Sequence, residues 1–388
     1  MKPRSAPRLA VVQFGAPTAV VNASLMGFLE GAGPGEVLGV VGGPAGLLGG
    51  ERRLLKGPSE AHGAKRADRV TLMDPTASSQ PGALLGAGRY PFTGADLDAI
   101  GELLAAAGID GLGLIGGNGT MFVAQELHDR AARSGTGLSV VGVPKTVDND
   151  LLGTDHAPGF PSAARFLIQA VRDLDLDHRA MQSIEQVRIV ETLGRSTGWL
   201  ALSTLAARSA TGGSPHLVYV PERPFSQDSF LDDVRDAVAS HGRAFVVVAE
   251  GLTTSLPSPF DQPVYDRPIS GGVGQSLAKL VEHRLGYGAR CEVLGLIQRC
   301  ASWAVSTVDS DEAYALGREG SRLLSEGVSG VMVALAERLQ SEAPTSRVPT
   351  TVPLAQVAGR TRPVSAGWVP HPSGAAEEFV AWLKPLLG

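Results

Sequence analysis

Two carboxylates, Asp148 and Asp150, stand two residues apart directly after an apolar run that ends at Val143. In an extended strand end, this spacing puts both side chains on the same side of the backbone. One carboxylate can then take a proton from a hydroxyl while the other lies near a divalent cation, as phosphoryl transfer requires. The stretch Thr146–Asp150 alone is equally compatible with a turn whose aspartates cap the backbone.

A second polar strand end favours the chemical interpretation. The sequence Gly116-Gly117-Asn118-Gly119-Thr120 directly follows the apolar run 111–115. Glycines at the start of a helix let backbone amides approach a phosphate group. Because the carboxyl ends of parallel strands meet at one edge of a sheet, we expect a phosphate site beside the two aspartates.

The elements that must position these residues follow an alternating pattern. Short apolar runs alternate with amphipathic stretches, which indicates an α/β fold with mainly parallel sheets. A chain of 388 residues favours two domains. Strands are predicted at 9–13, 37–41, 111–115, 138–143, 187–191, 216–220, 244–249 and 293–297, helices at 96–107, 122–132, 230–240, 274–283, 311–325 and 376–383, and breaks at 76–82, 253–272 and 341–353.

The bulk composition excludes several functions. The formal net charge of −5 offers no basic field for nucleic acid. No apolar stretch reaches a membrane-spanning length, and the start, Met1–Arg8, reads as neither a signal peptide nor an anchor. Cys291 and Cys300 are too few for a disulfide scaffold or a zinc cluster, so we expect a reducing, cytoplasmic location.

Six motifs in order along the chain resemble the signatures of the phosphofructokinase family. The resemblance covers nearly the whole chain, since residues 301–317 and the ending 382–388 are similar to the longer, pyrophosphate-type branch. It implies two Rossmann-like three-layer α/β/α domains with mainly parallel sheets. A phosphoryl-donor domain would comprise 1–159 with about 298–345, and a sugar-phosphate domain 160–297 with about 346–388. The motifs are 116–120, 144–150, 159–164, 190–195, 249–251 and 294–299.

The resemblance implies a role for each residue around the aspartates. Asp148 would be the general base that accepts the proton of the sugar's 1-hydroxyl, and Thr146 would contact the substrate or the transferring phosphoryl group. Asp150 and Asn118 would lie near a Mg²⁺ ion. Arg195 would be a cation near the reacting groups.

The residues of the implied donor site are compatible with either ATP or pyrophosphate as phosphoryl donor. Arg89 would neutralise the transferring phosphoryl group with its planar, permanently charged fork. Gly119 leaves room for the α-phosphate of ATP, whereas Lys145 is typical of pyrophosphate users. We favour ATP because steric exclusion is decisive and an extra lysine is tolerable. The implied donor-binding residues are Gly15, Ala16, Arg89, Tyr90, Gly117, Asn118, Gly119, Thr120 and Lys145.

The implied acceptor is fructose 6-phosphate. Glu250 would bind the sugar hydroxyls, and Arg290 and Arg299 the 6-phosphate. In the family the first of these arginines comes from a neighbouring subunit, so a homodimer or homotetramer is expected. The implied substrate-binding residues are Thr146, Asp148, Gln186, Leu193, Gly194, Arg195, Glu250, Arg290, Leu296 and Arg299.

Several positions depart from the family pattern. Phe14 and Ala16 replace small residues of the phosphate loop, and Asn118 replaces a magnesium-associated aspartate. Gln186 replaces an arginine, for which Arg188 on the same strand face is a candidate substitute, and Leu296 replaces a histidine or another polar residue.

Three hypotheses follow from these departures. The first is a glycolytic, magnesium-dependent 6-phosphofructokinase that makes fructose 1,6-bisphosphate from ATP or pyrophosphate. The second is a kinase for another sugar phosphate, motivated by Gln186 and Leu296. The third is a non-catalytic, regulatory family member, motivated by the altered loop and Asn118. Retention of Asp148, Asp150, Arg89 and Glu250 argues against it, because binding alone needs no general base.

Overall fold

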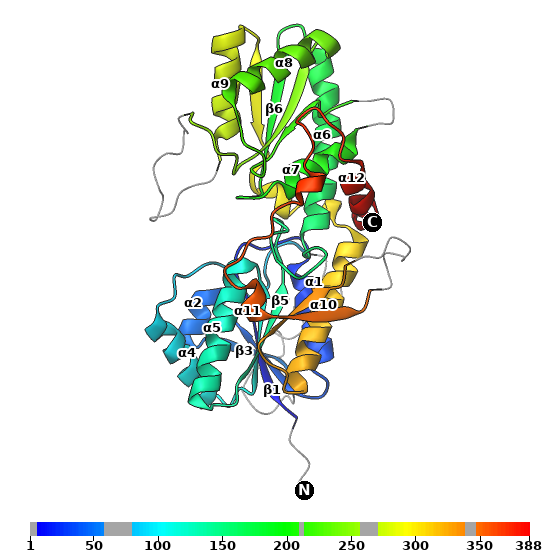
Figure 1. Cartoon of the computed structure of the whole chain (residues 1–388). Helices are drawn as coiled ribbons and strands as arrows, with labels where there is room; N and C mark the ends of the chain where they lie inside the picture. Colours follow the sequence, from blue (N-terminus) through cyan, green and yellow to red (C-terminus); the bar gives the residue numbers. More distant parts are fainter. Residues whose placement is uncertain (1–5, 58–79, 209–212, 257–270, 338–346) are drawn as a thin grey trace. The chain divides into compact units, whose positions relative to one another are not determined.

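The computed structural model describes residues 6–57, 80–208, 213–256, 271–337 and 347–388. The chain forms two compact units, each built from three stretches of sequence (Figure 1). Unit 1 comprises Met1–Thr146, Asp150–Gly159 and Val305–Thr361, and unit 2 comprises Val147–Asn149, Phe160–Ala304 and Arg362–Gly388. The two aspartates are thus divided between the units, since Asp148 is counted with unit 2 and Asp150 with unit 1.

Unit 1 contains a seven-stranded sheet in the order β11-β10-β5-β4-β1-β2-β3. Its five central strands pair in parallel, and only the edge strands β3 and β11 are antiparallel to their neighbours. The inner strands β4 and β5 are buried along their whole length, as expected for a sheet covered on both faces. The strands are β1 (Arg8–Gln13), β2 (Glu36–Val40), β3 (Arg52–Lys56), β4 (Gly111–Gly116), β5 (Ser139–Pro144), β10 (Val331–Leu335) and β11 (Pro349–Pro353).

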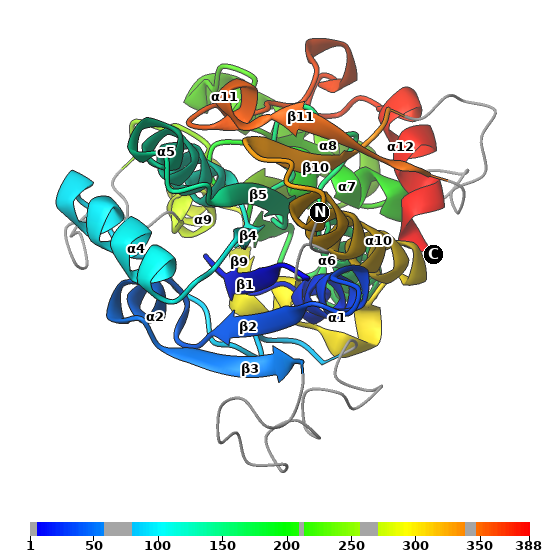
Figure 2. The ribbon, with the colours of Figure 1, turned by 90° about the horizontal axis from the view of Figure 1, so that it is seen from below.

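Helices cover both faces of this sheet (Figure 2). Helices α1 (Val21–Gly31) and α10 (Thr307–Ser325) cover one face. They touch closely, because a Cβ added to Gly27 would lie 1.9 Å from the Tyr314 carbonyl oxygen. The opposite face carries α2 (Gly43–Gly49), α4 (Gly94–Ala106), α5 (Asn118–Ser134) and α11 (Leu354–Val357).

Unit 2 contains a parallel four-stranded sheet in the order β7-β8-β6-β9. Side chains of α8 and α9 form one apolar core with β6, β7 and β8. On the other side of β8, Phe245 meets His178 of α6. The elements are α6 (Phe160–Met181), β6 (Val187–Thr192), α7 (Trp199–Ser203), β7 (Leu217–Tyr219), α8 (Gln227–His241), β8 (Ala244–Ala249), α9 (Val273–Leu285), β9 (Ala289–Val293) and α12 (Glu377–Leu383).

The expected α/β class with mainly parallel sheets is confirmed, with differences in single elements. The strand predicted at 293–297 is wrong, because β9 ends at Val293 and Gly295–Arg299 forms a 3₁₀ turn that begins at a positive φ of 59° on Gly295. The break predicted at 341–353 contains β11, which pairs with β10 and so belongs to unit 1. Residues 76–79, 257–270 and 341–346 of the predicted breaks lie outside the described residues.

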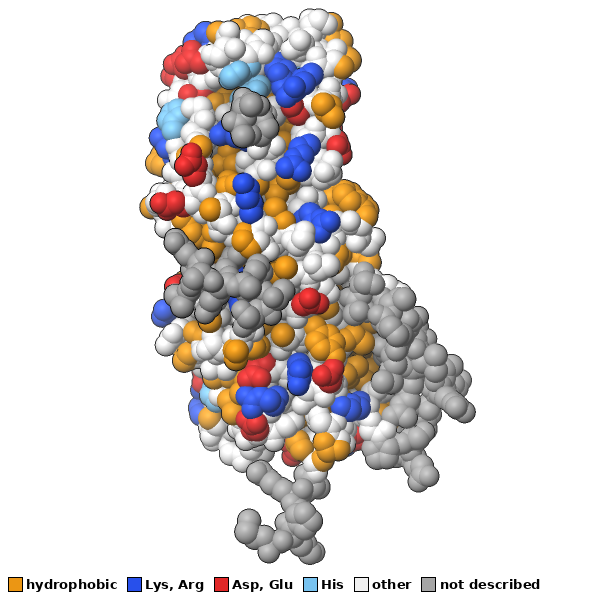
Figure 3. Space-filling view, turned by 90° about the vertical axis from the view of Figure 1, so that its right-hand side faces the viewer, with side chains coloured by type: hydrophobic (Ala, Val, Ile, Leu, Met, Phe, Trp, Pro, Cys, Tyr) orange, Lys and Arg blue, Asp and Glu red, His pale blue; other side chains and the backbone are white. Residues whose placement is uncertain are grey.

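Two surface properties bear on partners. Among the described residues, none of the helices combines the length and the apolar character that crossing a membrane demands. On the face shown in Figure 3, described side chains of both charges are interspersed with apolar ones.

Candidate functional site

The predicted donor residues of unit 1 lie at one edge of its sheet. Gly116 pairs with Pro144, and the Phe14 amide donates to the Ile115 carbonyl at 2.8 Å. The segments after β1, β4 and β5 therefore begin side by side at the carboxyl ends of their strands. This is the edge at which open parallel sheets bind ligands.

The loop after β1 is joined to the segment that carries Arg89. Gly15, at a φ of +73°, and Gly88 exchange backbone hydrogen bonds of 2.7 and 3.1 Å, so the exposed residues Arg89 and Tyr90 follow directly beside the loop. The Phe14 ring is 4% exposed and stacks on Phe92 at a centroid distance of 6.0 Å. Its bulk therefore lies in the apolar core of unit 1.

Lys145 supports the same loop. Its side chain is buried, and its Nζ donates to the carbonyl oxygens of Phe14 at 2.9 Å and of Ala16 at 2.6 Å. A buried ammonium needs such partners. Through these two hydrogen bonds, Lys145 supports the backbone around Ala16.

The start of α5 is shaped to receive an anion. Gly117 precedes the helix in extended conformation, and Asn118 and Gly119 are its first residues. Gly116 must lack a side chain, because a Cβ there would meet the Thr120 hydroxyl at 2.1 Å. At Gly119, in contrast, a Cβ would have no atom within 4 Å. The helix thus begins beside open space, with amides and the positive end of its dipole available to a phosphate.

Asp150 and Asn118 fit a magnesium ion by their chemistry. The Asn118 amide nitrogen donates to the Arg360 carbonyl, which leaves the amide oxygen as the atom for a cation, and Asp150 is a largely buried carboxylate. The described residues hold no cluster of three His, Cys, Asp or Glu side chains suited to a metal. A pair of oxygen donors suits Mg²⁺, which keeps several waters and binds one or two protein groups together with substrate phosphates.

In unit 2, three of the predicted residues come together. Arg195 Nε lies 3.4 Å from Asp148 Oδ2, and the Arg195 backbone N–H donates to Glu250 Oε1 at 3.0 Å. The Asp148 side chain is 14% exposed and that of Arg195 is 47% exposed, so the pair is accessible from solvent. The structure therefore brings Asp148, Arg195 and Glu250 together, as a joint role of the three residues requires.

The turn that carries Arg195 is strained and tightly fitted. Arg195 has a φ of +50°, which is unusual for a residue with a side chain, and it follows Gly194 at +140°. A Cβ on Gly251 would lie 1.5 Å from the Arg195 carbonyl oxygen, and the Leu193 amide donates to Gln298 at 3.0 Å. Such strain costs roughly 1–3 kcal/mol and persists where surrounding contacts impose it, commonly at functional sites.

Two contacts of this site were missed in the sequence. Thr197 Oγ1 donates to the Asp148 carbonyl at 3.1 Å, and Arg362 donates to the Asn149 carbonyl at 3.2 and 3.3 Å while its guanidinium lies 4.5 Å from the centre of the Trp199 ring. They hold the backbone on both sides of the Asp148 side chain. Thr197 lies two residues after the predicted site residue Arg195, and this closeness in sequence could have indicated its role. Nothing in the sequence around Arg362 indicates its contact with Asn149.

Gln186 and Arg290 are not brought to this cluster within one chain. Gln186 precedes β6 and Leu193 follows it, a separation of about 20 Å along a strand. Gln186 Oε1 accepts from the Gly288 amide at 2.8 Å, and Arg290 is 60% exposed with Glu185 3.7 Å away. Arg299 and Leu296, in contrast, belong to the 3₁₀ turn whose Gln298 contacts Leu193.

Arg188 does not replace the missing arginine. Its side chain is 1% exposed, and its guanidinium binds the carboxylates of Glu185 and Asp177, the latter at 2.9 Å. Two partnered carboxylates explain why a buried guanidinium is tolerated. The interpretation of Arg188 as an anion-binding substitute is therefore wrong.

Comparisons with known proteins show the family to which the chain belongs. The profile of the family described as "Phosphofructokinase" matches residues 8–319. The chain is 37% identical over 347 residues to a sulfofructose kinase of Alkalicoccus urumqiensis, covering 89% of this chain and 88% of that protein. It is 30% identical over 395 residues to a pyrophosphate–fructose 6-phosphate 1-phosphotransferase of Rhodospirillum rubrum, covering 98% and 94%.

Two further similarities complete the comparison. An ATP-dependent 6-phosphofructokinase of Corynebacterium efficiens is 33% identical over 347 residues, covering 86% of this chain and 91% of that protein. The crystal structure of a pyrophosphate-dependent phosphofructokinase from Marinobacter aquaeolei superimposes with a TM-score of 0.83 at 27% identity, covering 98% of this chain and 91% of that one.

Proposed function

Because the chain belongs to the phosphofructokinase family, we propose that it is a magnesium-dependent kinase that phosphorylates the 1-hydroxyl of sulfofructose, with ATP as donor. Family membership gives the class of reaction, phosphoryl transfer to a hydroxyl group. The finer assignment of the acceptor rests on one observation, the uncharged Gln186 at a position where the family resemblance implies an arginine. The similarity to a sulfofructose kinase supports the same assignment.

The argument for the acceptor is one of charge. A sulfonate carries a single negative charge, whereas a phosphate monoester carries about −1.5 to −2 near neutral pH. Gln186 supplies no positive charge and its side chain is bonded to Gly288, and Leu296 supplies no hydrogen bond. A site that keeps Arg290 and Arg299 but lacks the third cation suits the less charged group.

Fructose 6-phosphate is the second candidate acceptor and would give fructose 1,6-bisphosphate. Retention of Glu250, Arg290 and Arg299 favours it, as does similarity to fructose 6-phosphate phosphotransferases over nearly the whole chain. The non-catalytic hypothesis is less favoured, because the Phe14 ring lies in the core of unit 1 and because Asp148 and Asp150 are retained.

ATP is the favoured donor and pyrophosphate the alternative. The open space beside Gly119 would accept an α-phosphate, and Lys145 has a backbone-supporting role that does not require pyrophosphate. When bound, Mg²⁺ would neutralise charge on the donor phosphates.

The chain's own residues supply the rest of the proposed mechanism. Asp148 takes the proton from the 1-hydroxyl, whose oxygen forms a bond to the terminal phosphorus of the donor while the bond from that phosphorus to the leaving phosphate oxygen breaks. Arg89 and Arg195 offset charge on the phosphoryl group, and Thr146 orients it. Glu250 binds sugar hydroxyls. The step is an in-line displacement without a covalent enzyme intermediate.

A comparison of acceptors tests the proposal. We expect kcat/KM with ATP to be higher for sulfofructose than for fructose 6-phosphate. The double variant Gln186→Arg/Leu296→His should move the ratio toward fructose 6-phosphate by tenfold or more, because a charge-assisted hydrogen bond contributes about 1.5–3 kcal/mol. The measurement is a coupled assay with both acceptors and both donors.

A matched control adds the same charge nearby. Gln182→Arg, at an exposed position shortly before β6, should leave the acceptor ratio unchanged. A wild-type preference for fructose 6-phosphate, unaltered in the double variant, would establish the second candidate in place of the first.

We also propose that a second copy of the chain completes the site. Strand β9 is an edge strand of its sheet, and Val293, Leu296 and Ile297, which follow Arg290, are 47%, 60% and 45% exposed. An apolar edge next to an anion-binding arginine suits a self-complementary contact. That contact would bring Arg290 of one copy, together with Gln186 just before the neighbouring strand β6, to the acceptor of the other copy.

Ile297→Glu is expected to dissociate the oligomer and to raise the acceptor KM at least tenfold, because a charge at a buried apolar contact is costly. Light scattering coupled to size exclusion, alongside kinetics, checks both effects. Leu103→Glu, at an exposed apolar position on α4, serves as the control. An active wild-type monomer would contradict the proposal.

A further inference from the structure

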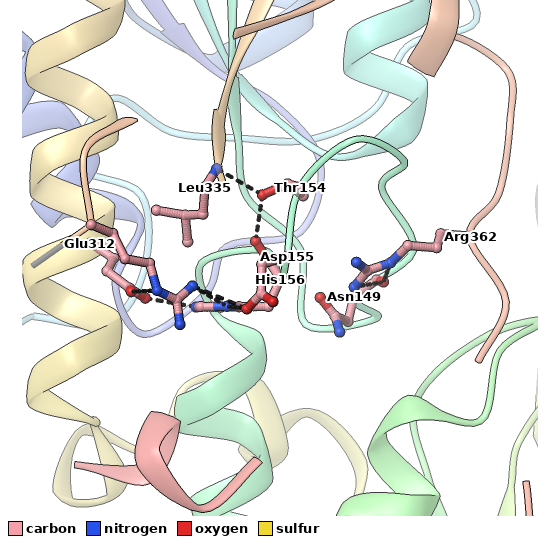
Figure 4. A network of polar contacts seen from close by, with 8 residues as sticks. Asn149, Thr154, Asp155, His156, Glu312, Leu335 and Arg362 are labelled. Atoms are coloured by element: carbon pink, nitrogen blue, oxygen red, sulfur yellow. Dashed lines mark hydrogen bonds and ion pairs between the residues drawn. The ribbon is translucent and has the colours of Figure 1, made fainter. Parts of the chain in front are cut away.

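A buried cluster of ionisable groups lies in unit 1, and none of its members has been assigned a role above. The side chain of His156 is fully buried, with Nδ1 2.9 Å from Asp155 Oδ2 and Nε2 2.7 Å from Glu312 Oε2 (Figure 4). Arg347 joins both carboxylates, at 3.0 Å from Asp155 and 3.4 Å from Glu312. We call these four residues the ion cluster.

The charges in this cluster cancel only when the histidine is protonated. Burial by itself disfavours the charged imidazole, but the nearby carboxylates of Glu312 and Asp155 outweigh that effect and raise the pKa of His156 above its usual value. Two carboxylates then face one guanidinium and one imidazolium. Apolar residues of similar volume commonly stabilise a core as well as buried ion pairs do, so stability alone is a weak reason for this cluster.

The cluster anchors one short stretch of chain, Asp150–Gly159. His156 and Asp155 belong to this stretch, whereas Glu312 lies on α10 and Arg347 lies shortly before β11. The stretch is also held by β10, because the Asp155 amide donates to the Leu335 carbonyl and the Leu335 amide donates to Thr154 Oγ1, both at 3.0 Å.

The end of the same stretch touches the proposed site directly. The Thr146 amide donates to the Pro158 carbonyl at 3.0 Å, and Thr146 forms a parallel bridge with Gly159. The Gly159 amide in turn donates to Asp309 Oδ1 of α10 at 2.8 Å. A displacement of the stretch would therefore move Thr146 at one end and Asp150 at the other.

We infer that the ion cluster is a positioning device for catalysis: Glu312 and Arg347 hold His156 and Asp155 so that Thr146 and Asp150 keep their catalytic geometry. The inference rests on the proposed function for the roles of those two residues. It adds His156, Glu312 and Arg347 as positioning residues, none of which belongs to the expected site. A shift of about 1 Å in such groups is enough to cost roughly 10²-fold in rate.

His156→Gln tests the inference, because it removes the imidazolium and leaves the cluster with one uncompensated negative charge. We expect kcat to fall at least tenfold while the KM values for ATP and acceptor change less than twofold. Backbone amides of residues 146–159 should exchange hydrogen faster in this variant. Glu326→Gln, at the exposed end of α10, should change neither measurement.

A second variant that restores the charge balance of the ion cluster distinguishes a positioning role from a loss of packing. The double variant His156→Gln/Glu312→Gln again has equal numbers of positive and negative groups, and it should recover part of the kcat lost by His156→Gln. Packing loss alone would instead make the double variant worse than the single one, and that order would overturn the inference.

The pH profile gives a third readout. Because the pKa of His156 is raised in the folded protein, its stabilising contribution is fully present below the usual histidine pKa and is lost as pH rises through the raised value. Wild-type kcat should therefore show a basic limb that is absent in His156→Gln. Charged groups facing the ring in the described part of the chain include Asp155, Glu312 and Arg347, and the Leu335 backbone of β10 bonds to the same stretch.

The inference and the proposed function fail in different ways. Wild-type protein that phosphorylates neither acceptor with either donor would overturn the proposed function. Hydrogen exchange of the backbone amides of residues 146–159 in His156→Gln would still test whether the ion cluster holds this stretch in place. An active His156→Gln variant with wild-type kcat and wild-type exchange would overturn the inference and leave the proposed function intact.

Discussion

Asp148→Asn is expected to lower kcat by about 10² to 10⁴, the range in which a general base contributes. Asparagine has nearly the same shape, but its amide does not accept the proton of the 1-hydroxyl. Asp148 pairs with the half-exposed Arg195, and loss of an ion pair open to solvent should cost little stability. The check is kcat with saturating donor and acceptor, together with the thermal unfolding midpoint.

The matched control for this change is Asp98→Asn, which removes an exposed carboxylate paired with Arg130. It should leave kcat unchanged. A folded Asp148→Asn protein with near wild-type turnover would remove Asp148 from the mechanism, and with it the argument that the strained turn at Arg195 serves catalysis.

Gly119→Asp is expected to reduce kcat/KM for ATP by about 10² or more while pyrophosphate use is retained. Opposition of like charges costs several kcal/mol, and the new carboxylate would stand where the α-phosphate is proposed to lie. The fold should tolerate the change, because a Cβ at Gly119 meets no atom within 4 Å. Aspartate in the first turn of a helix is also stabilising. Initial rates with each donor check the expectation.

Gly101→Asp provides a closely matched control, since Gly101 also lies in a helix and also has open space around its added Cβ. It should affect neither donor. An equal loss of kcat/KM with ATP and with pyrophosphate in Gly119→Asp would show that both donors need the start of α5. The open space beside Gly119 would then no longer support ATP over pyrophosphate.

Much of the sheet architecture could be predicted because its strands are buried on both faces and so appear as continuous apolar runs. The positions of Gly15, Gly117 and Lys145 then follow from adjacency at strand ends. Helix α6 was not predicted, although its buried residues recur at helical spacing, at Phe160, Ala164, Leu167, Val171, Asp175 and His178. The strand at β9 was placed too late because 293–297 is the apolar run, whereas β9 itself contains Arg290 and Glu292 and the chain turns at Gly295.

Long-range polar contacts were beyond prediction from the sequence. Nothing local in the sequence pairs His156 with Glu312, which is 156 residues away, or Gln186 with the Gly288 backbone. Arg188 shows the converse error: its face on the strand was predictable, but the two carboxylates that bind it were not. Residue type and spacing indicate which groups are chemically capable, whereas their partners depend on the folded chain.

Because each unit is built from three separate stretches of the chain, unit 1 stays incomplete during most of the protein's synthesis. Unit 1 lacks α10, β10 and β11 until residues 305–361 have left the ribosome. Until then the edge of β5 has no partner and the face later covered by α10 is bare, although all of β1–β5 already exists. Nascent chains of this length expose an apolar sheet edge, the kind of surface that chaperones bind and that aggregates form from.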